Sequence, residues 1–227
     1  YFKKGLSFEG NTDQILFGKN PRLKDEFNRL FNAIFGNPED CKKIVRLLAK
    51  RHIGYTREEI AQKTGLPLGG GLTDILSALI ESDFVLRYTP YGKPGNVEYY
   101  KLIDNFCLFW LKHVEPNHSA ISFMSDHITS DVMKSWRGVA FEEVCWQHIA
   151  QVKRALEIGG VRSSLSAWSV KGDDTKEGVQ IDLLIVRDDN VVNLCEMKFA
   201  GDVYSIDKDE EAKLRNRIEM LKNTLTP

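Results

Sequence analysis

The sequence lacks the features that mark several large classes of protein. Its 227 residues include 31 Lys and Arg against 32 Asp and Glu, a net charge of −1, which excludes nucleic-acid binding through overall positive charge. No apolar run approaches the roughly 20 residues that span a bilayer. The start of the chain carries no apolar stretch of a secretory leader. We therefore expect a cytoplasmic protein with no membrane partner.

Cysteine and histidine patterns of metal-bound or disulfide-rich proteins are missing too. The four cysteines form no CxxC pair and the five histidines form no HExxH motif, so we expect buried, reduced thiols instead of a zinc site or disulfides. With 42% hydrophobic and 28% charged residues, the composition is that of an ordinary folded chain.

The first half of the chain has the pattern of helices followed by a hairpin. Thr56 and Glu59 have the spacing of a capping box, and Pro38 has the place of a first helical residue. The predicted elements are helices over residues 21–35, 38–52, 56–66 and 72–82 and strands over 84–88 and 97–102, joined by a turn-rich loop over 89–96. Three helices and a hairpin in this order predict a winged helix-turn-helix over 38–104, after a helical segment over 1–37.

The helix that would read DNA in such a module is poorly suited to the task. Base readout uses Arg, Lys, Asn or Gln, and residues 72–82 contain none of these but do contain Asp74 and Glu81, which repel phosphate. Four basic residues nearby offer only a weak patch: Arg57, Lys63, Arg87 and Lys93. The sequence thus favours an interaction or spacer role over DNA reading, and both stay open.

The second half begins with helices and continues with strands. The pattern predicts a helical connector over 105–130, then a long helix over 131–156, strands over 161–170, 179–187 and 191–199, and a helix over 210–222. Together with the first half, this predicts the α+β class.

Three charged residues lie within the last two apolar strands. Glu196 and Lys198 are two residues apart, so both project from one face of a strand. A tight turn at 188–190 brings Asp182 nearly opposite them. Two carboxylates and an ammonium group suit Mg²⁺ bound against a phosphodiester. An ion pair that serves structure alone fits the same spacing.

Asp182, followed after thirteen residues by Glu196-Met197-Lys198, resembles the D…ExK core of the PD-(D/E)XK nuclease superfamily. The earlier helix, with Phe141-Glu142-Glu143, is similar to the superfamily's first-helix signature. The resemblance implies a restriction-endonuclease-like α/β domain with a mixed sheet over 131–227. It further implies that Asp182, Glu196 and Glu142 bind Mg²⁺ or Mn²⁺ and that Lys198 positions the nucleophilic water.

Two features depart from the superfamily pattern. Gln180 stands where relatives often carry an acidic residue, and the superfamily core would have a further strand after the helix over 210–222. From residue 131 onward, 14 Lys and Arg stand against 17 Asp and Glu. A nucleic-acid groove would therefore have to be built locally, with Lys213, Arg215, Arg217 and Lys222 as candidates; a solvated helix face is the alternative.

The whole chain resembles the C-terminal half of a family of prokaryotic AAA-type ATPases with a winged helix and a PD-(D/E)XK-like domain. The residues that carry this likeness are 23–27, 56–60, 70–73, 99–104 and 194–198. No GxxxxGK[ST] motif is present, so ATP is expected only in an ATPase domain that would precede this piece. Residues 1–37 would be the tail of that domain's lid.

These observations lead to one leading hypothesis and two alternatives. The leading one is a metal-dependent nuclease domain, acting on DNA, of a larger ATPase that is its partner in the same polypeptide. The first alternative keeps the nuclease-like fold without catalysis, as an interaction or regulatory module. The second is a winged-helix DNA-binding protein.

Overall fold

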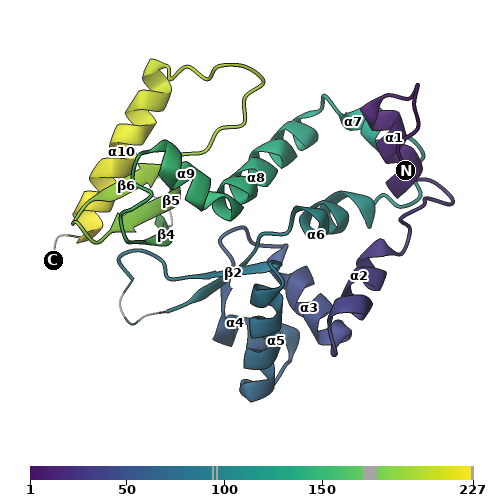
Figure 1. Cartoon of the computed structure of the whole chain (residues 1–227), viewed down its shortest axis with the longest axis horizontal. Helices are drawn as coiled ribbons and strands as arrows, with labels where there is room; N and C mark the ends of the chain where they lie inside the picture. The colour runs from purple at the N-terminus through teal and green to yellow at the C-terminus, as the bar shows by residue number, and fades with distance from the viewer. Residues whose placement is uncertain (94, 96, 171–177, 226–227) are drawn as a thin grey trace. The chain divides into compact units, whose positions relative to one another are not determined.

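The computed structural model describes residues 1–93, 95, 97–170 and 178–225, and it divides into two compact units (Figure 1). The first unit is Tyr1–Arg87 with Tyr100–Glu143, and the second is Tyr88–Tyr99 with Val144–Pro227. Helices occur together with small antiparallel sheets, which confirms the α+β class. Within the described ranges, no helix has the length and apolarity needed to cross a membrane.

The first unit opens with α1 (Phe8–Leu16), which lies within the predicted helical segment over 1–37 but before its one helix with assigned bounds, over 21–35. Its buried Asp13 accepts hydrogen bonds from the backbone N–H groups of Met124 at 2.7 Å and Ser125 at 3.0 Å. These groups belong to the first turn of α7 (Phe123–His127), whose N–H groups have no partner within the helix. A contact that joins residues 111 positions apart leaves no periodic signal in the sequence.

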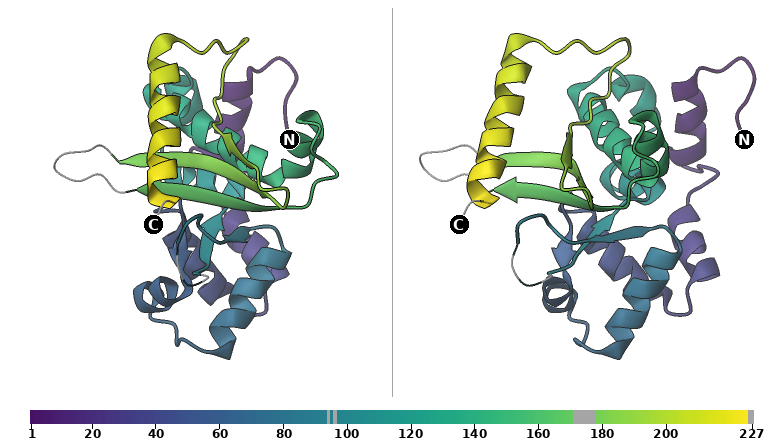
Figure 2. Two further views of the ribbon diagram at one scale, coloured as in Figure 1. Left: turned by 90° about the vertical axis from the view of Figure 1, so that its left-hand side faces the viewer. Right: turned by 60° about the vertical axis from the view of Figure 1, so that its left-hand side comes forward.

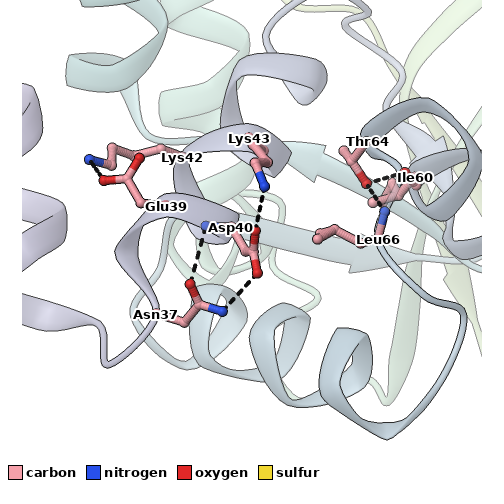
Figure 3. A network of polar contacts seen from close by, with 8 residues as sticks. All are labelled: Asn37, Glu39, Asp40, Lys42, Lys43, Ile60, Thr64 and Leu66. Atoms are coloured by element: carbon pink, nitrogen blue, oxygen red, sulfur yellow. Dashed lines mark hydrogen bonds and ion pairs between the residues drawn. The ribbon is translucent and has the colours of Figure 1, made fainter.

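The next two helices are α2 (Glu26–Ile34) and α3 (Pro38–Leu48). The side chain of Asn37 caps α3: its Oδ1 accepts from the Asp40 N–H at 3.4 Å, and its Nδ2 donates to Asp40 Oδ2 at 2.8 Å (Figure 3). Lys43 pairs with the same carboxylate at 2.8 Å. Pro38 is the first helical residue, as the sequence predicts.

A capping box starts α4 (Arg57–Thr64), directly after the short strand β1 (Tyr55–Thr56). Thr56 Oγ1 accepts from the Glu59 N–H at 3.2 Å, and Glu59 Oε2 accepts from the Thr56 N–H at 2.9 Å. Both bonds of the predicted box are therefore present.

A helix and a hairpin follow: α5 (Gly70–Glu81), β2 (Val85–Tyr88) and β3 (Tyr99–Leu102). The three strands form a sheet in the order β1-β3-β2. Pro94 and Asn96, part of the predicted loop, lie outside the described residues. One apolar core joins these elements through buried side chains such as Phe31, Ile44, Ile60, Leu76 and Leu79.

In the second half of the chain, one predicted helix changes its helical type along its length, and another is divided in two. The connector contains α6 (Asn105–Phe109), which passes into a π-helical segment, η1 (Trp110–Val114). The long helix is α8 (Asp131–Gln147) followed by α9 (Ile149–Ala155), with His148 outside helical geometry between them.

The second unit contains an antiparallel sheet of β4 (Ser163–Val170), β5 (Val179–Arg187) and β6 (Val192–Cys195), in that order. The helix α10 (Lys208–Leu225) lies across this sheet (Figure 2). Its Leu221 is buried in an apolar cluster with residues of β4 and β5.

The sheet differs from the predicted one in two respects. All pairing among the described strands of this unit is antiparallel instead of mixed, because consecutive strands joined by short connections fold back on each other. The last strand ends at Cys195 instead of residue 199, so Glu196 and Lys198 lie just beyond it.

All four cysteines lie in the described part of the chain and are free thiols. Cys41 and Cys107 are buried, whereas Cys145 and Cys195 are half-buried. Burial raises the pKa of the Cys41 thiol to about 11, so this group stays protonated at neutral pH.

Candidate functional site

Asp182 and Glu196 lie beside each other where β5 and β6 meet. The pairing of these strands runs as far as Leu183 with Cys195, and the two acidic residues are the next residues along each segment. The Met197 N–H donates a hydrogen bond to Asp182 Oδ2 at 3.1 Å. The backbone therefore holds one carboxylate against the segment that carries the other.

Glu196 is the centre of an ion-pair network. Lys198 Nζ lies 2.8 Å from Glu196 Oε1, and an Arg217 guanidinium nitrogen lies 2.5 Å from Oε2. Lys198 Nζ also lies 3.4 Å from Glu210 Oε1. The Glu196 side chain is 12% exposed, so a largely buried carboxylate has a cationic partner on each oxygen.

The surroundings of Lys198 favour its charged form. Burial by itself lowers the pKa of this ammonium group, but the nearby carboxylates of Glu196 and Glu210 outweigh burial and raise the pKa above its ordinary value. Lys198 therefore acts as a fixed positive charge, able to orient an anion or a water molecule but not to accept a proton at neutral pH.

The donor types at this site fit a hard divalent cation. Mg²⁺ is commonly bound through one or two carboxylates, with water and phosphate oxygens completing the set, and Asp182 and Glu196 offer two. Among the described residues, no group of three or more His, Cys, Asp or Glu side chains is arranged to hold a metal ion. A cation at this site would also have to compete with Lys198 and Arg217 for Glu196.

Glu142, the third carboxylate that the superfamily resemblance implies, belongs to the first unit and pairs with a histidine. Glu142 Oε2 lies 2.6 Å from His52 Nε2, and Glu143 Oε1 lies 3.2 Å from His52 Nδ1. Lys101 Nζ lies 3.0 Å from the same Glu143 oxygen. The structure thus brings Asp182, Glu196 and Lys198 together in the second unit, and within the first unit it pairs Glu142 with His52.

Glu143 is the most deeply buried member of that cluster, with no exposed side-chain surface. Burial raises the pKa of its carboxyl group, and the opposing effects of Lys101 and His52 only reduce this rise. A buried charge of this kind is stable only with its partners in place. The cluster therefore links α8 to the hairpin of the first unit through ion pairs.

One of the candidate phosphate-binding residues is engaged within the protein. The Arg57 guanidinium donates to the Gly69 carbonyl oxygen and to Thr73 Oγ1, both at 2.8 Å. Arg57 therefore holds the turn before α5, the helix that carries Asp74 and Glu81. The residues of α5 themselves include no Lys or Arg.

Neither Glu210 nor the contact of Arg217 with the carboxylates is among the features predicted from the sequence. A signal for both was present, because residues 210, 214, 217 and 221 recur at helical spacing and so share one face of α10. Leu214 and Leu221 on that face are half-buried and buried. The two charged residues on the face that packs inward are those that reach Glu196 and Lys198.

Comparison with known proteins finds a distant relative. The chain is 28% identical over 196 residues to MJECL04, an uncharacterized protein of Methanocaldococcus jannaschii, and the match covers 83% of this chain but 42% of that protein. No protein-family model matches the chain. No solved structure matches it either.

Proposed function

We propose that the second unit is a divalent-metal-dependent phosphodiesterase of the PD-(D/E)XK type that acts on DNA. The observation that carries the proposal is the hydrogen bond from the Met197 N–H to Asp182, which places this aspartate against the Glu196–Lys198 segment. Two carboxylates and an ammonium group at the edge of a largely apolar sheet have the composition that phosphodiester hydrolysis requires.

Each residue has a distinct role in this proposal. Asp182 and Glu196 would hold Mg²⁺ or Mn²⁺, and the cation would supply stabilisation of negative charge and a more acidic water molecule. Lys198, kept cationic by its neighbours, orients the attacking oxygen toward phosphorus. Glu142, which the superfamily resemblance would add as a third carboxylate, pairs with His52 within the first unit.

We further propose that this unit works together with a winged helix and an ATPase domain of the same protein. Residues 38–104 form a winged helix-turn-helix, and the chain is part of a larger protein with an AAA-type ATPase domain. The length of the relative supports this view, since the match spans less than half of that protein. ATP would bind to the ATPase domain and not to the winged helix or the nuclease-like unit.

Cleavage assays with single- and double-stranded DNA and RNA in Mg²⁺ or Mn²⁺ test the function. We expect Asp182→Asn and Lys198→Gln each to lower the cleavage rate at least about a hundredfold. The first removes a proposed metal ligand, and the second removes a fixed charge next to the reacting groups, a loss that typically costs at least that much. Asp188→Asn is the matched control, because Asp188 is exposed and pairs with Arg162, which is itself exposed. Cleavage that is indifferent to both site substitutions would refute the assignment.

A second candidate is a nuclease-like module without catalysis, which binds a partner or regulates the ATPase. Its specific support is that both oxygens of Glu196 already face cations. Gln180, opposite Ser169 in the sheet, also offers an amide in place of a carboxylate. An intact fold that shows no Mn²⁺ binding at millimolar concentration would favour this candidate.

A further inference from the structure

The basic residues of α10 look alike in the sequence but differ in the structure. Arg217 is 21% exposed and reaches Glu196 Oε2 at 2.5 Å. Arg215 is 76% exposed and pairs with Glu211 one turn earlier on the same helix. Lys213 is 66% exposed and lies 3.8 Å from Glu210. Arg217 alone among these three contacts a carboxylate proposed to bind metal.

The contact between Arg217 and Glu196 matters because Glu196 is also a proposed metal ligand. Each oxygen of Glu196 faces a cation, Lys198 on Oε1 and Arg217 on Oε2, and Lys198 is shared with Glu210. A divalent cation that binds Glu196 through Oε2 would displace the guanidinium from this oxygen. The displaced group is a planar, permanently charged fork whose geometry matches a phosphate better than an ammonium group does.

We propose that Arg217 exchanges partners, holding Glu196 in the metal-free chain and binding a phosphate group of the nucleic-acid backbone once a metal ion occupies the carboxylates. This inference rests on the proposed function and adds a residue to it. Arg217 is then a substrate-binding residue, and in the metal-free chain it is a competitor of the metal.

If Arg217 has this role, replacing it changes the affinity for Mn²⁺ and the affinity for DNA in opposite directions. Without the guanidinium, Mn²⁺ no longer competes with a fixed positive charge, so Arg217→Gln binds Mn²⁺ about fivefold more tightly or better. The same variant loses a charge-assisted contact to phosphate, so it binds a DNA oligonucleotide in Mn²⁺ at least about fivefold more weakly. A merely structural role would weaken both.

The experiment measures Mn²⁺ binding by calorimetry and oligonucleotide binding by fluorescence anisotropy. Arg215→Gln, two residues away on the same helix, should change neither affinity. Arg217→Lys keeps the charge and serves if Arg217→Gln does not fold; it should bind Mn²⁺ like the wild type and DNA more weakly, because an ammonium group lacks the fork.

Two results would overturn the inference, and they are distinguishable. If Asp182→Asn abolishes Mn²⁺ binding while Arg217→Gln leaves it unchanged or weaker, Arg217 does not compete with the metal and only this inference fails. If Asp182→Asn binds Mn²⁺ as the wild type does, the proposed function itself fails, and the inference falls with it.

Discussion

Two adjacent glutamates show how far single residues can be predicted here. Glu142 and Glu143 stand in a helix signature that resembles a nuclease motif, yet the structure pairs both with His52, about 90 positions earlier in the chain. The hairpin brings Asp182 next to the Glu196 segment over a short turn, so spacing could predict it. No local pattern predicts the pairing with His52. Residues so far apart in the chain meet only because the packing of the whole first unit brings them together.

His113 gives a prediction that concerns pH. Its side chain is buried among Phe109, Phe123 and Trp136, and burial lowers the pKa of the imidazole from 6.5 to about 4. The unfolded chain therefore binds a proton at a higher pH than the folded chain does. The stability that His113 contributes is complete above pH 6.5 and is lost as the pH falls toward 4.

We expect the free energy of unfolding of the wild type to fall by about 2–3 kcal/mol more than that of His113→Phe between pH 6.5 and pH 4. Urea denaturation at a series of pH values measures this difference. His118→Gln, at an exposed position, should follow the wild type. Parallel pH profiles for the wild type and His113→Phe would contradict the account.

Among the elements, those set by local chemistry were predicted and those set by distant contacts were not. The start of α3 at Pro38 and the capping box of α4 follow from residues within one turn of each other. In contrast, the contact from Asp13 of α1 to α7 and the end of β6 at Cys195 were not predicted. The periodicity of apolar residues indicates which face of an element is buried, but it does not indicate which distant residue a polar side chain on that element will contact.

Two glycines that end turns around α4 differ in a way that can be measured. Both have left-handed backbone geometry, with φ +78° at Gly54 and +73° at Gly65. A Cβ atom added at Gly54 would lie 2.1 Å from the Tyr100 carbonyl oxygen, whereas one at Gly65 meets nothing within 4 Å.

We expect Gly65→Ala to cost about 1–2 kcal/mol of stability, the penalty for a left-handed alanine. Gly54→Ala should cost at least about 3 kcal/mol, because the collision with backbone next to β3 adds to that penalty. Chemical denaturation of the two variants provides the comparison. Equal losses would mean that the approach of Gly54 to Tyr100 is not a feature of the folded protein.

For the molecule as a whole, the division into units could not be deduced from sequence order. Residues 88–99, the end of the predicted hairpin, belong to the second unit, where the Tyr91 N–H donates to the Ala167 carbonyl oxygen at 3.1 Å. Ser166 Oγ donates to the Thr89 carbonyl oxygen at 2.7 Å. These contacts join the hairpin end to β4, more than 70 residues later.

The near-zero net charge also has a meaning for the whole chain. It excludes general electrostatic attraction to nucleic acid, so the proposed binding of DNA requires a few cations held in place at one site. In the second unit, Lys198 and Arg217 are two such cations, and both are held by Glu196. We therefore propose that Glu196, together with Asp182, exchanges Arg217 for a metal ion while Lys198 stays in place.

Calorimetric titration of Mn²⁺ into the wild type, Asp182→Asn and Asp188→Asn tests this claim most directly. We predict one saturable Mn²⁺ site per chain in the wild type and in Asp188→Asn, and none in Asp182→Asn at millimolar metal, with all three proteins folded. Identical titrations for the wild type and Asp182→Asn, or no binding to any of the three, would contradict it.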